Sequence, residues 1–188
     1  MSHITGKHLR TYNEAFSDGL TVRDLEGRSL EEAVPAGREA AARQLVLDPG
    51  FFADLAPIEG RREAVRELAE RYEVFIASAA MEVPTSFAAK YAWLRRHFPF
   101  IPPRHVVFCG DKGVLDVDYL IDDTPRHFAR FRGNPVLFSA PHNRGEARFL
   151  RVTGWDEVRR LLLRPDPAPG QAPDVPRTVE AVSESAPC

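Results

Sequence analysis

Short apolar runs alternate with amphipathic stretches along the chain from residue 57 onward, and this alternation constrains the fold more than any other feature. EVFIASA, HVVFCG, DYLIDD and PVLFSA have the length and the β-branched or aromatic content of strands. The stretches around them, GRREAVRELAERY, VPTSFAAKYAWLRRHFPF, TPRHFARFRG and WDEVRRLLL, have helical periodicity. Strands that alternate with helices are typical of a parallel sheet covered on both faces. We therefore predict an α/β fold with a doubly wound parallel sheet.

The chain divides into three regions that differ in sequence pattern and composition. Residues 1–56 show no strand pattern and are predicted to form an N-terminal helical cap region. Residues 57–163 carry the alternating pattern and are predicted to form the α/β core. Residues 164–188 are rich in Pro, Ala, Ser and acidic residues, so we predict a disordered tail. In the second predicted helix of the core, the residues expected on the inner face are Phe87, Tyr91, Leu94 and Phe98.

The bulk properties narrow the functional classes. The 188-residue chain has a formal net charge of −2 and a sequence pI of about 6.3, so we expect neither nucleic acid nor an anionic membrane as a partner. Its two cysteines, Cys109 and Cys188, do not form a disulfide framework, which favours a cytoplasmic location. No secretory signal or apolar run of membrane-spanning length is found. A homodimer is left open.

Polar residues follow the predicted strands, and they are the candidates for a functional site. In parallel sheets, ligands bind beyond the carboxyl ends of the strands, so these side chains should converge on one rim. Carboxylate oxygens with a lysine and a hydroxyl suit Mg²⁺ together with a phosphate group. The residues at these strand ends are Ser78, Asp111, Lys112, Asp122, Asp123 and Ser139.

Each of these residues also has a structural interpretation. Asp122 and Asp123 suit a helix N-cap before TPRHF, because Asp at that position with Pro close behind is common. Lys112 alone would be a solvated loop lysine, and Ser78 alone a small residue where a strand meets a helix. The order and register of the set favour the functional interpretation.

The same residues resemble those of a known superfamily. Ser78 after VFIA, Lys112 in GDKG and LIDD at 120–123 look like motifs two, three and four of the haloacid dehalogenase (HAD) superfamily of phosphohydrolases. DPGFFADLAPIEG, KYAWLRRHF, GDKGVLDVDYLIDD and the late HN at 142–143 resemble the 5'(3')-deoxyribonucleotidases. The similarity runs from about Lys7 to Leu163. It implies a HAD-like, Rossmannoid sheet with a small helical cap.

The resemblance implies a Mg²⁺-dependent hydrolase that dephosphorylates (deoxy)nucleoside monophosphates through an aspartyl-phosphate. The expected partner is a nucleoside monophosphate or another small phosphate ester. Ser78 and Lys112 would hold the phosphoryl group. Asp123 would bind Mg²⁺. Asp122 would lie next to Asp123 and would not bind the metal directly. The aromatic residues expected to sandwich the nucleobase are Phe16, Phe51 and Phe52. For Phe51 and Phe52, packing at the hinge between cap and core is an equal alternative.

The sequence departs from the family pattern at its start. The family opens with a strand ending in D-x-D, whose first aspartate is the nucleophile and whose second is the acid/base. MSHIT contains no aspartate, and the first acidic residue, Glu14, falls within a predicted helix. We therefore expect the nucleophile and the acid/base aspartate to be absent, the first strand to be truncated and the activity of the chain to be impaired. A misassigned start codon, which we favour, and a real truncation are both open.

Two other functional classes are left open. A catalytically dead phosphometabolite-binding or interaction module, a truncated paralogue, would keep Ser78, Lys112 and Asp123 and form no product. A receiver-like signalling domain also has an acid–lysine cluster on a doubly wound sheet, but the helical cap speaks against it. The sequence predicts neither the preferred base and sugar nor the position of the phosphate.

Overall fold

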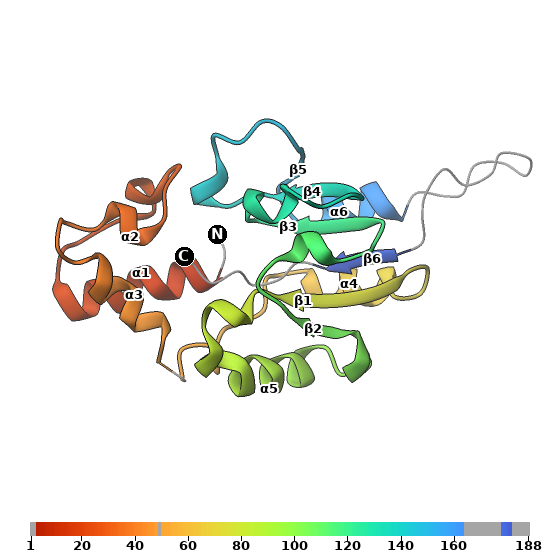
Figure 1. The fold of residues 1–188 in the computed structure, drawn as a ribbon, viewed down its shortest axis with the longest axis horizontal. Helices are drawn as coiled ribbons and strands as arrows, with labels where there is room; N and C mark the ends of the chain where they lie inside the picture. The colour runs from red at the N-terminus through yellow and green to blue at the C-terminus, as the bar shows by residue number, and fades with distance from the viewer. Residues whose placement is uncertain (1–2, 49, 164–177, 182–188) are drawn as a thin grey trace, which may run out of the picture.

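The computed structural model describes residues 3–48, 50–163 and 178–181, and it contains a six-stranded sheet beside a group of helices (Figure 1). All strand pairs are parallel, in the order β2-β1-β6-β3-β4-β5. The prediction of an α/β fold with a doubly wound parallel sheet is confirmed. The strands are β1 (Glu73–Ser78), β2 (Val106–Phe108), β3 (Tyr119–Asp122), β4 (Asn134–Phe138), β5 (Leu150–Val152) and β6 (Thr178–Ala181).

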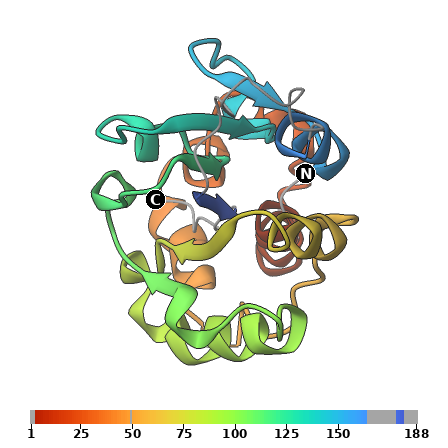
Figure 2. The same ribbon diagram turned by 90° about the vertical axis from the view of Figure 1, so that its right-hand side faces the viewer.

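The alternation of side chains along the strands builds a core on each face of the sheet. Ile121 and Val136 belong to the main apolar cluster, whereas their chain neighbours Leu120 and Leu137 pack with Phe128 in a smaller cluster. Helices α4 (Arg61–Leu68) and α6 (Trp155–Leu162) lie side by side over the main cluster (Figure 2). The second face is covered by the short 3₁₀ helix η6 (Pro125–Phe128).

Helix α5 (Phe87–His97) runs along the β2 edge of the sheet (Figures 1 and 2). Of its predicted inner residues, Leu94 and Phe98 are buried, but Tyr91 is not. Tyr91, predicted to face the core, is 40% exposed. The buried positions of the helix are Lys90, Trp93 and Leu94. A lysine is tolerated on this stripe because its ammonium group lies 4.1 Å from the centroid of the Phe52 ring, so an aromatic face replaces part of its hydration.

The centre of the sheet is closed by a strand from the C-terminal segment. Strand β6 lies between β1 and β3, where Val179 pairs with Val74 and Glu180 pairs with Leu120. Sequence analysis predicted disorder for residues 164–188, and the structure differs from that prediction at the four residues of β6. Residues 164–177 and 182–188 lie outside the described residues. Without β6, β1 and β3 would present unpaired backbone groups in the middle of the sheet.

The N-terminal region is helical, as expected, with α1 (His3–Phe16), α2 (Leu30–Ala33) and α3 (Glu39–Val46). These helices enclose a separate apolar cluster built from Leu9, Tyr12, Leu25, Leu30, Val34 and Ala42. The cap contacts the core where the Gly27 amide donates to the Pro141 carbonyl at 3.0 Å. Its two ends, Ile4 and Val46, pack into the main cluster, so the cap and the core are joined by shared packing. No helix within the described ranges is both long enough and apolar enough to cross a membrane.

Buried His8 is expected to make the stability pH-dependent. Burial lowers the pKa of His8 below its ordinary 6.5, although the hydrogen bond to Ala42 and the charge of Glu31 act in the other direction. The unfolded chain therefore binds a proton that the folded chain does not, and stability falls as pH drops below 6.5. We expect the free energy of unfolding in urea to decrease between pH 7 and 5.5, by at most about 1.4 kcal/mol per pH unit.

His8→Gln is the matched variant, because its amide N–H replaces the ring donor to Ala42. It should flatten this part of the stability profile. An unchanged slope in the variant would show that other groups cause the pH dependence.

Candidate active site

Two strand ends and one loop bring the predicted site residues to the same rim of the sheet. Ser78 is the last residue of β1, Asp122 is the last residue of β3, and Asp123 follows it. Lys112 begins the 3₁₀ helix η5 (Lys112–Val114), two residues after Gly110. All four side chains are buried, and those of Lys112 and Asp122 are 0% exposed.

Asp122 and Lys112 form a buried ion pair. The Lys112 ammonium group donates to Asp122 Oδ2, and His127 Nδ1 donates to the same oxygen at 3.0 Å. The Thr124 amide donates to Asp122 Oδ1 at 2.8 Å. Burial alone would raise the pKa of Asp122, but the Lys112 charge and His127 together lower it to about 2. Asp122 is therefore a fixed negative charge with both carboxylate oxygens hydrogen-bonded.

Asp123 has the opposite electrostatic character. Burial and the adjacent Asp122 charge raise the pKa of Asp123 above its ordinary value. Its backbone is held firmly, because its carbonyl oxygen accepts from Asn143 Nδ2 at 2.7 Å and from His142 Nε2 at 2.9 Å. A buried carboxylate with a raised pKa gains from a bound cation, which lets it ionise.

The donor set fits a Mg²⁺ ion that is coordinated jointly by the protein, water and a substrate phosphate. Within the described ranges, no group of three or more acidic, histidine or cysteine side chains could enclose a metal ion. Mg²⁺ usually takes one or two carboxylates and completes its coordination with water and substrate phosphate, so a full protein cage is not needed. Asp123 supplies a hard carboxylate of this kind, while both oxygens of Asp122 are already engaged.

Ser78 lies on the other side of β6 from Asp122. Its hydroxyl is buried and has no hydrogen-bond partner among the described residues. A small cavity beside it is lined by two buried cations, Arg61 and Lys90, together with Trp93. Ser78 therefore offers a hydroxyl group in a positively charged setting.

Sequence reasoning missed both of these cations. Arg61 lies 5.5 Å and 5.8 Å from the ring centroids of Phe98 and Trp155. It begins α4 immediately after Gly60, whose φ of 72° lies in the left-handed region that favours glycine. For Lys90, the available signal was a lysine on the apolar stripe of a helix, since Lys90, Trp93 and Leu94 follow helical spacing.

Two of the polar residues expected at the rim have local partners instead. The Asp111 carboxylate accepts from the Gly113 amide at 2.8 Å and pairs with Arg130 at 3.1 Å on the surface. The Ser139 hydroxyl accepts from Arg151 at 3.1 Å. Both interactions stabilise the loops that carry them.

The three aromatic residues proposed for the base do not form one group in the structure. Phe51 and Phe52 are 4% and 1% exposed and pack edge to face in the main cluster, with their ring centroids 5.1 Å apart. Phe16 packs in the cap against Tyr12, with Arg38 over its ring. This packing favours the hinge interpretation of Phe51 and Phe52, and a sandwich around a nucleobase remains a prediction.

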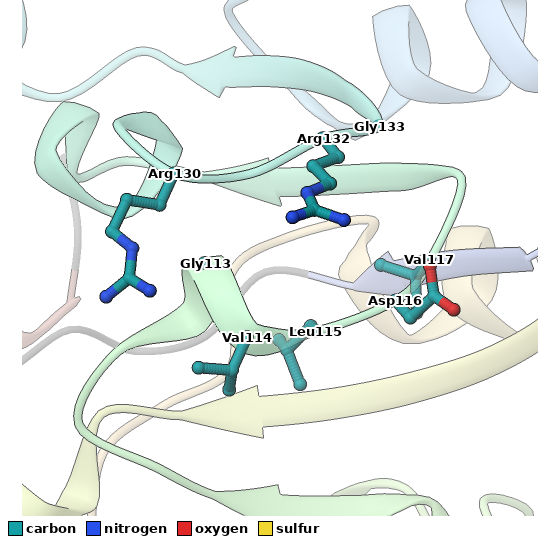
Figure 3. A pocket seen from close by; sticks show the side chains of 8 residues that line it. All are labelled: Gly113, Val114, Leu115, Asp116, Val117, Arg130, Arg132 and Gly133. Atoms are coloured by element: carbon teal, nitrogen blue, oxygen red, sulfur yellow. The ribbon is translucent and has the colours of Figure 1, made fainter.

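A separate cavity of about 430 Å³ opens beyond Lys112 (Figure 3). It lies between the loop that follows Lys112 and the loop that follows η6, and it shares no lining residue with the rim. Gly133 brings the loops close, because a Cβ there would lie 2.4 Å from the Val117 carbonyl oxygen. Its lining residues are Gly113, Val114, Leu115, Asp116, Val117, Arg130, Arg132 and Gly133.

The chain is similar to a family of nucleotidases and to bacterial proteins named after the same activity. The family model described as "5' nucleotidase, deoxy (Pyrimidine), cytosolic type C protein" matches residues 1–166. A Staphylococcus aureus (strain Mu50) protein named "Putative 5'(3')-deoxyribonucleotidase" is 43% identical over 163 residues, which cover 87% of this chain and 90% of the relative. A Bacillus subtilis (strain 168) protein named "5'(3')-deoxyribonucleotidase" is 44% identical over 117 residues, covering 62% of this chain and 68% of the relative.

Proposed function

Because the chain belongs to the HAD-like family of cytosolic type C 5' nucleotidases, we propose that it acts on (deoxy)nucleoside monophosphates as a Mg²⁺-dependent phosphohydrolase. The observation that carries the proposal is the buried Lys112–Asp122 pair, with Asp123 beside it at the end of β3. A charge pair without access to water is costly to maintain, which is typical of a site that must hold charged groups in fixed positions.

Each residue of the rim has a role in this proposal. Asp123 would hold Mg²⁺, which supplies positive charge against the phosphate oxygens. Asp122 keeps Lys112 oriented, and Lys112 adds a fixed positive charge to the rim. The Ser78 hydroxyl donates to a phosphate oxygen, and Lys90 adds charge on the β1 side. Action on free nucleotides in the cytoplasm completes the proposal.

In this proposal the residues of the rim would bind and orient a phosphate, but we assign no attacking carboxylate among the described residues. The family route through an aspartyl-phosphate needs such a group. We therefore propose that turnover by this chain is low. This favours, as the second candidate, a module that binds the same nucleotides without forming product.

The test measures phosphate release and binding on the same protein. Phosphate release from dUMP and dTMP with Mg²⁺ is followed alongside calorimetric titration of both nucleotides. We expect saturable binding with slow release. Binding without any release would favour the second candidate, and an absence of both would overturn the two together. Rapid release would show that a nucleophile is present and that our assignment of its absence is wrong.

Ser78→Ala tests whether binding occurs at the rim. We expect it to weaken nucleotide binding about tenfold, the loss of one hydrogen bond to a charged group. Ser139→Ala is the matched control, because Ser139 also follows a strand but is bonded to Arg151. Equal effects of the two substitutions would place the binding site elsewhere.

A further inference from the structure

A cavity of about 430 Å³ lies between two loops that are in close contact at both of its ends (Figure 3). One wall, residues 113–117, leads from η5 to β3, and the other, residues 130–133, leads from η6 to β4. A Cβ at Gly113 would lie 2.8 Å from the Arg130 Cβ, and one at Gly133 would lie 2.4 Å from a carbonyl oxygen of the first wall. The two walls therefore meet at both glycines, and the cavity between them has the size of a small-molecule site.

Two arginines line this cavity from the same wall. Arg130 and Arg132 are exposed, and Figure 3 shows both side chains extending toward the opposite loop. The side chain of Arg132 has no hydrogen-bond or ion-pair partner among the described residues. Of the described residues that line the cavity only Asp116 is acidic, so the two arginines leave an excess of positive charge. This lining favours an anion as the ligand.

The second arginine has a partner that it can exchange. Arg130 pairs with Asp111 at 3.1 Å, and the two side chains are 75% and 49% exposed. An ion pair this open to water contributes little to stability, so an anion in the cavity can take over the guanidinium group at little cost. Asp111 keeps a second interaction, because its carboxylate also accepts from the Gly113 amide at 2.8 Å.

A phosphate group suits this wall better than a carboxylate does. A guanidinium group donates two parallel N–H groups, and these occupy both oxygens of a carboxylate. A phosphate group has further oxygens, which accept from a second guanidinium group. Two arginines on one wall therefore match a phosphate.

We propose that this cavity is a second anion site, which takes the phosphate group of a small molecule. The site is separate from the rim, since no rim residue lines the cavity. It goes beyond the proposed function and does not depend on it, because Arg130 and Arg132 recognise the ligand and the rim residues do not.

Calorimetric titration of pyrophosphate into the full chain tests the site, because pyrophosphate presents phosphate oxygens to both arginines. The buffer contains EDTA, so that no divalent metal ion can hold pyrophosphate at the rim. We expect saturable binding. An absence of binding would overturn the inference, whatever the nucleotide titrations show for the rim.

Arg132→Met tests the residue itself. We expect it to weaken pyrophosphate binding about tenfold, because it removes hydrogen bonds between charged groups. Arg126→Met is the matched control, because Arg126 is a partly exposed arginine of η6 that pairs with Glu82 and does not line the cavity. At physiological ionic strength the control should change the affinity less than about twofold. Equal effects would mean that pyrophosphate responds to the general surface charge, and the inference would fail.

Ser78→Ala separates the cavity from the rim. The affinity for pyrophosphate should equal that of the unsubstituted chain, even where the same substitution weakens nucleotide binding. A loss of pyrophosphate binding in Ser78→Ala would place pyrophosphate at the rim and would overturn the inference.

Asp111→Asn should change the affinity in the opposite direction. Asparagine keeps an oxygen that accepts from the Gly113 amide, but it removes the charge that pairs with Arg130. Pyrophosphate should therefore bind about two- to fivefold more tightly. A damaged fold would weaken binding, so a gain in affinity cannot come from misfolding. An unchanged or lower affinity would contradict the proposed site.

Discussion

Replacing Lys112 by methionine is expected to lower the free energy of unfolding by about 3–5 kcal/mol, because it leaves Asp122 as a buried charge without its cation. Both side chains are 0% exposed, so water cannot take over the role of the ammonium group. Methionine keeps most of the volume of lysine, so the loss of packing is small. Urea unfolding at pH 7, with the slope of the transition checked for constancy, measures the effect.

Two controls identify the origin of that loss. Asp122→Asn in the Lys112→Met background removes the stranded charge and should recover at least half of the lost stability, as a double-mutant cycle would record. Arg130→Met breaks the exposed ion pair with Asp111 and should cost less than about 1 kcal/mol. A double variant as unstable as Lys112→Met would mean that packing, and not charge, determines the result.

The strand ends of the core were predictable because their signals are local. Each of the runs around Ser78, Lys112 and Asp122 carries its own apolar pattern, and parallel strands place their carboxyl ends on the same side. It was harder to predict which of these side chains bond to one another. The motif pattern assigned Lys112 to a phosphate, whereas the structure shows it bonded to Asp122, a contact that depends on how the loop after β2 folds back.

The burial of Arg61 was not predictable from the local pattern, and for Lys90 the only local signal was its position on the apolar stripe of α5. Arg61 and Lys90 are buried next to aromatic rings from distant segments, Trp155 in one case and Phe52 in the other. Periodicity registers a lysine or arginine as polar and assigns it to the outer face. Only the assembled packing shows that an aromatic face lies opposite.

Strand β6 was missed for a related reason. The segment Thr178–Ala181 is only four residues long, contains Glu180 and lies in a Pro-, Ser- and acid-rich stretch, so its own pattern does not predict a strand. The strand forms there because the backbone N–H and C=O groups of β1 and β3 need a hydrogen-bonding partner between the two strands. Sequence analysis predicted a truncated first strand, but it did not indicate that a C-terminal segment would form a strand of the sheet.

Replacing Val179 by proline is expected to have the second large effect on stability, because β6 is the hydrogen-bonding partner of both β1 and β3. Val179 pairs with Val74 on one side and with Tyr119 on the other, so it lies between the two halves of the sheet. Proline removes the backbone N–H and does not fit a central strand, so we expect a loss of about 3 kcal/mol or more in the free energy of unfolding. Hydrogen exchange should also show weaker protection of the amides of β1 and β3, because both strands lose a partner.

Leu150→Pro is the matched control for this substitution. Leu150 is the first residue of β5, which is an edge strand, and proline is tolerated at such positions. Its effect should be less than half that of Val179→Pro, and the protection of β1 should not change. Two results together would contradict this role of β6. The amides of residues 178–181 in the unsubstituted chain would exchange as fast as those of an unstructured peptide, and Val179→Pro would unfold at the same urea concentration as the unsubstituted chain.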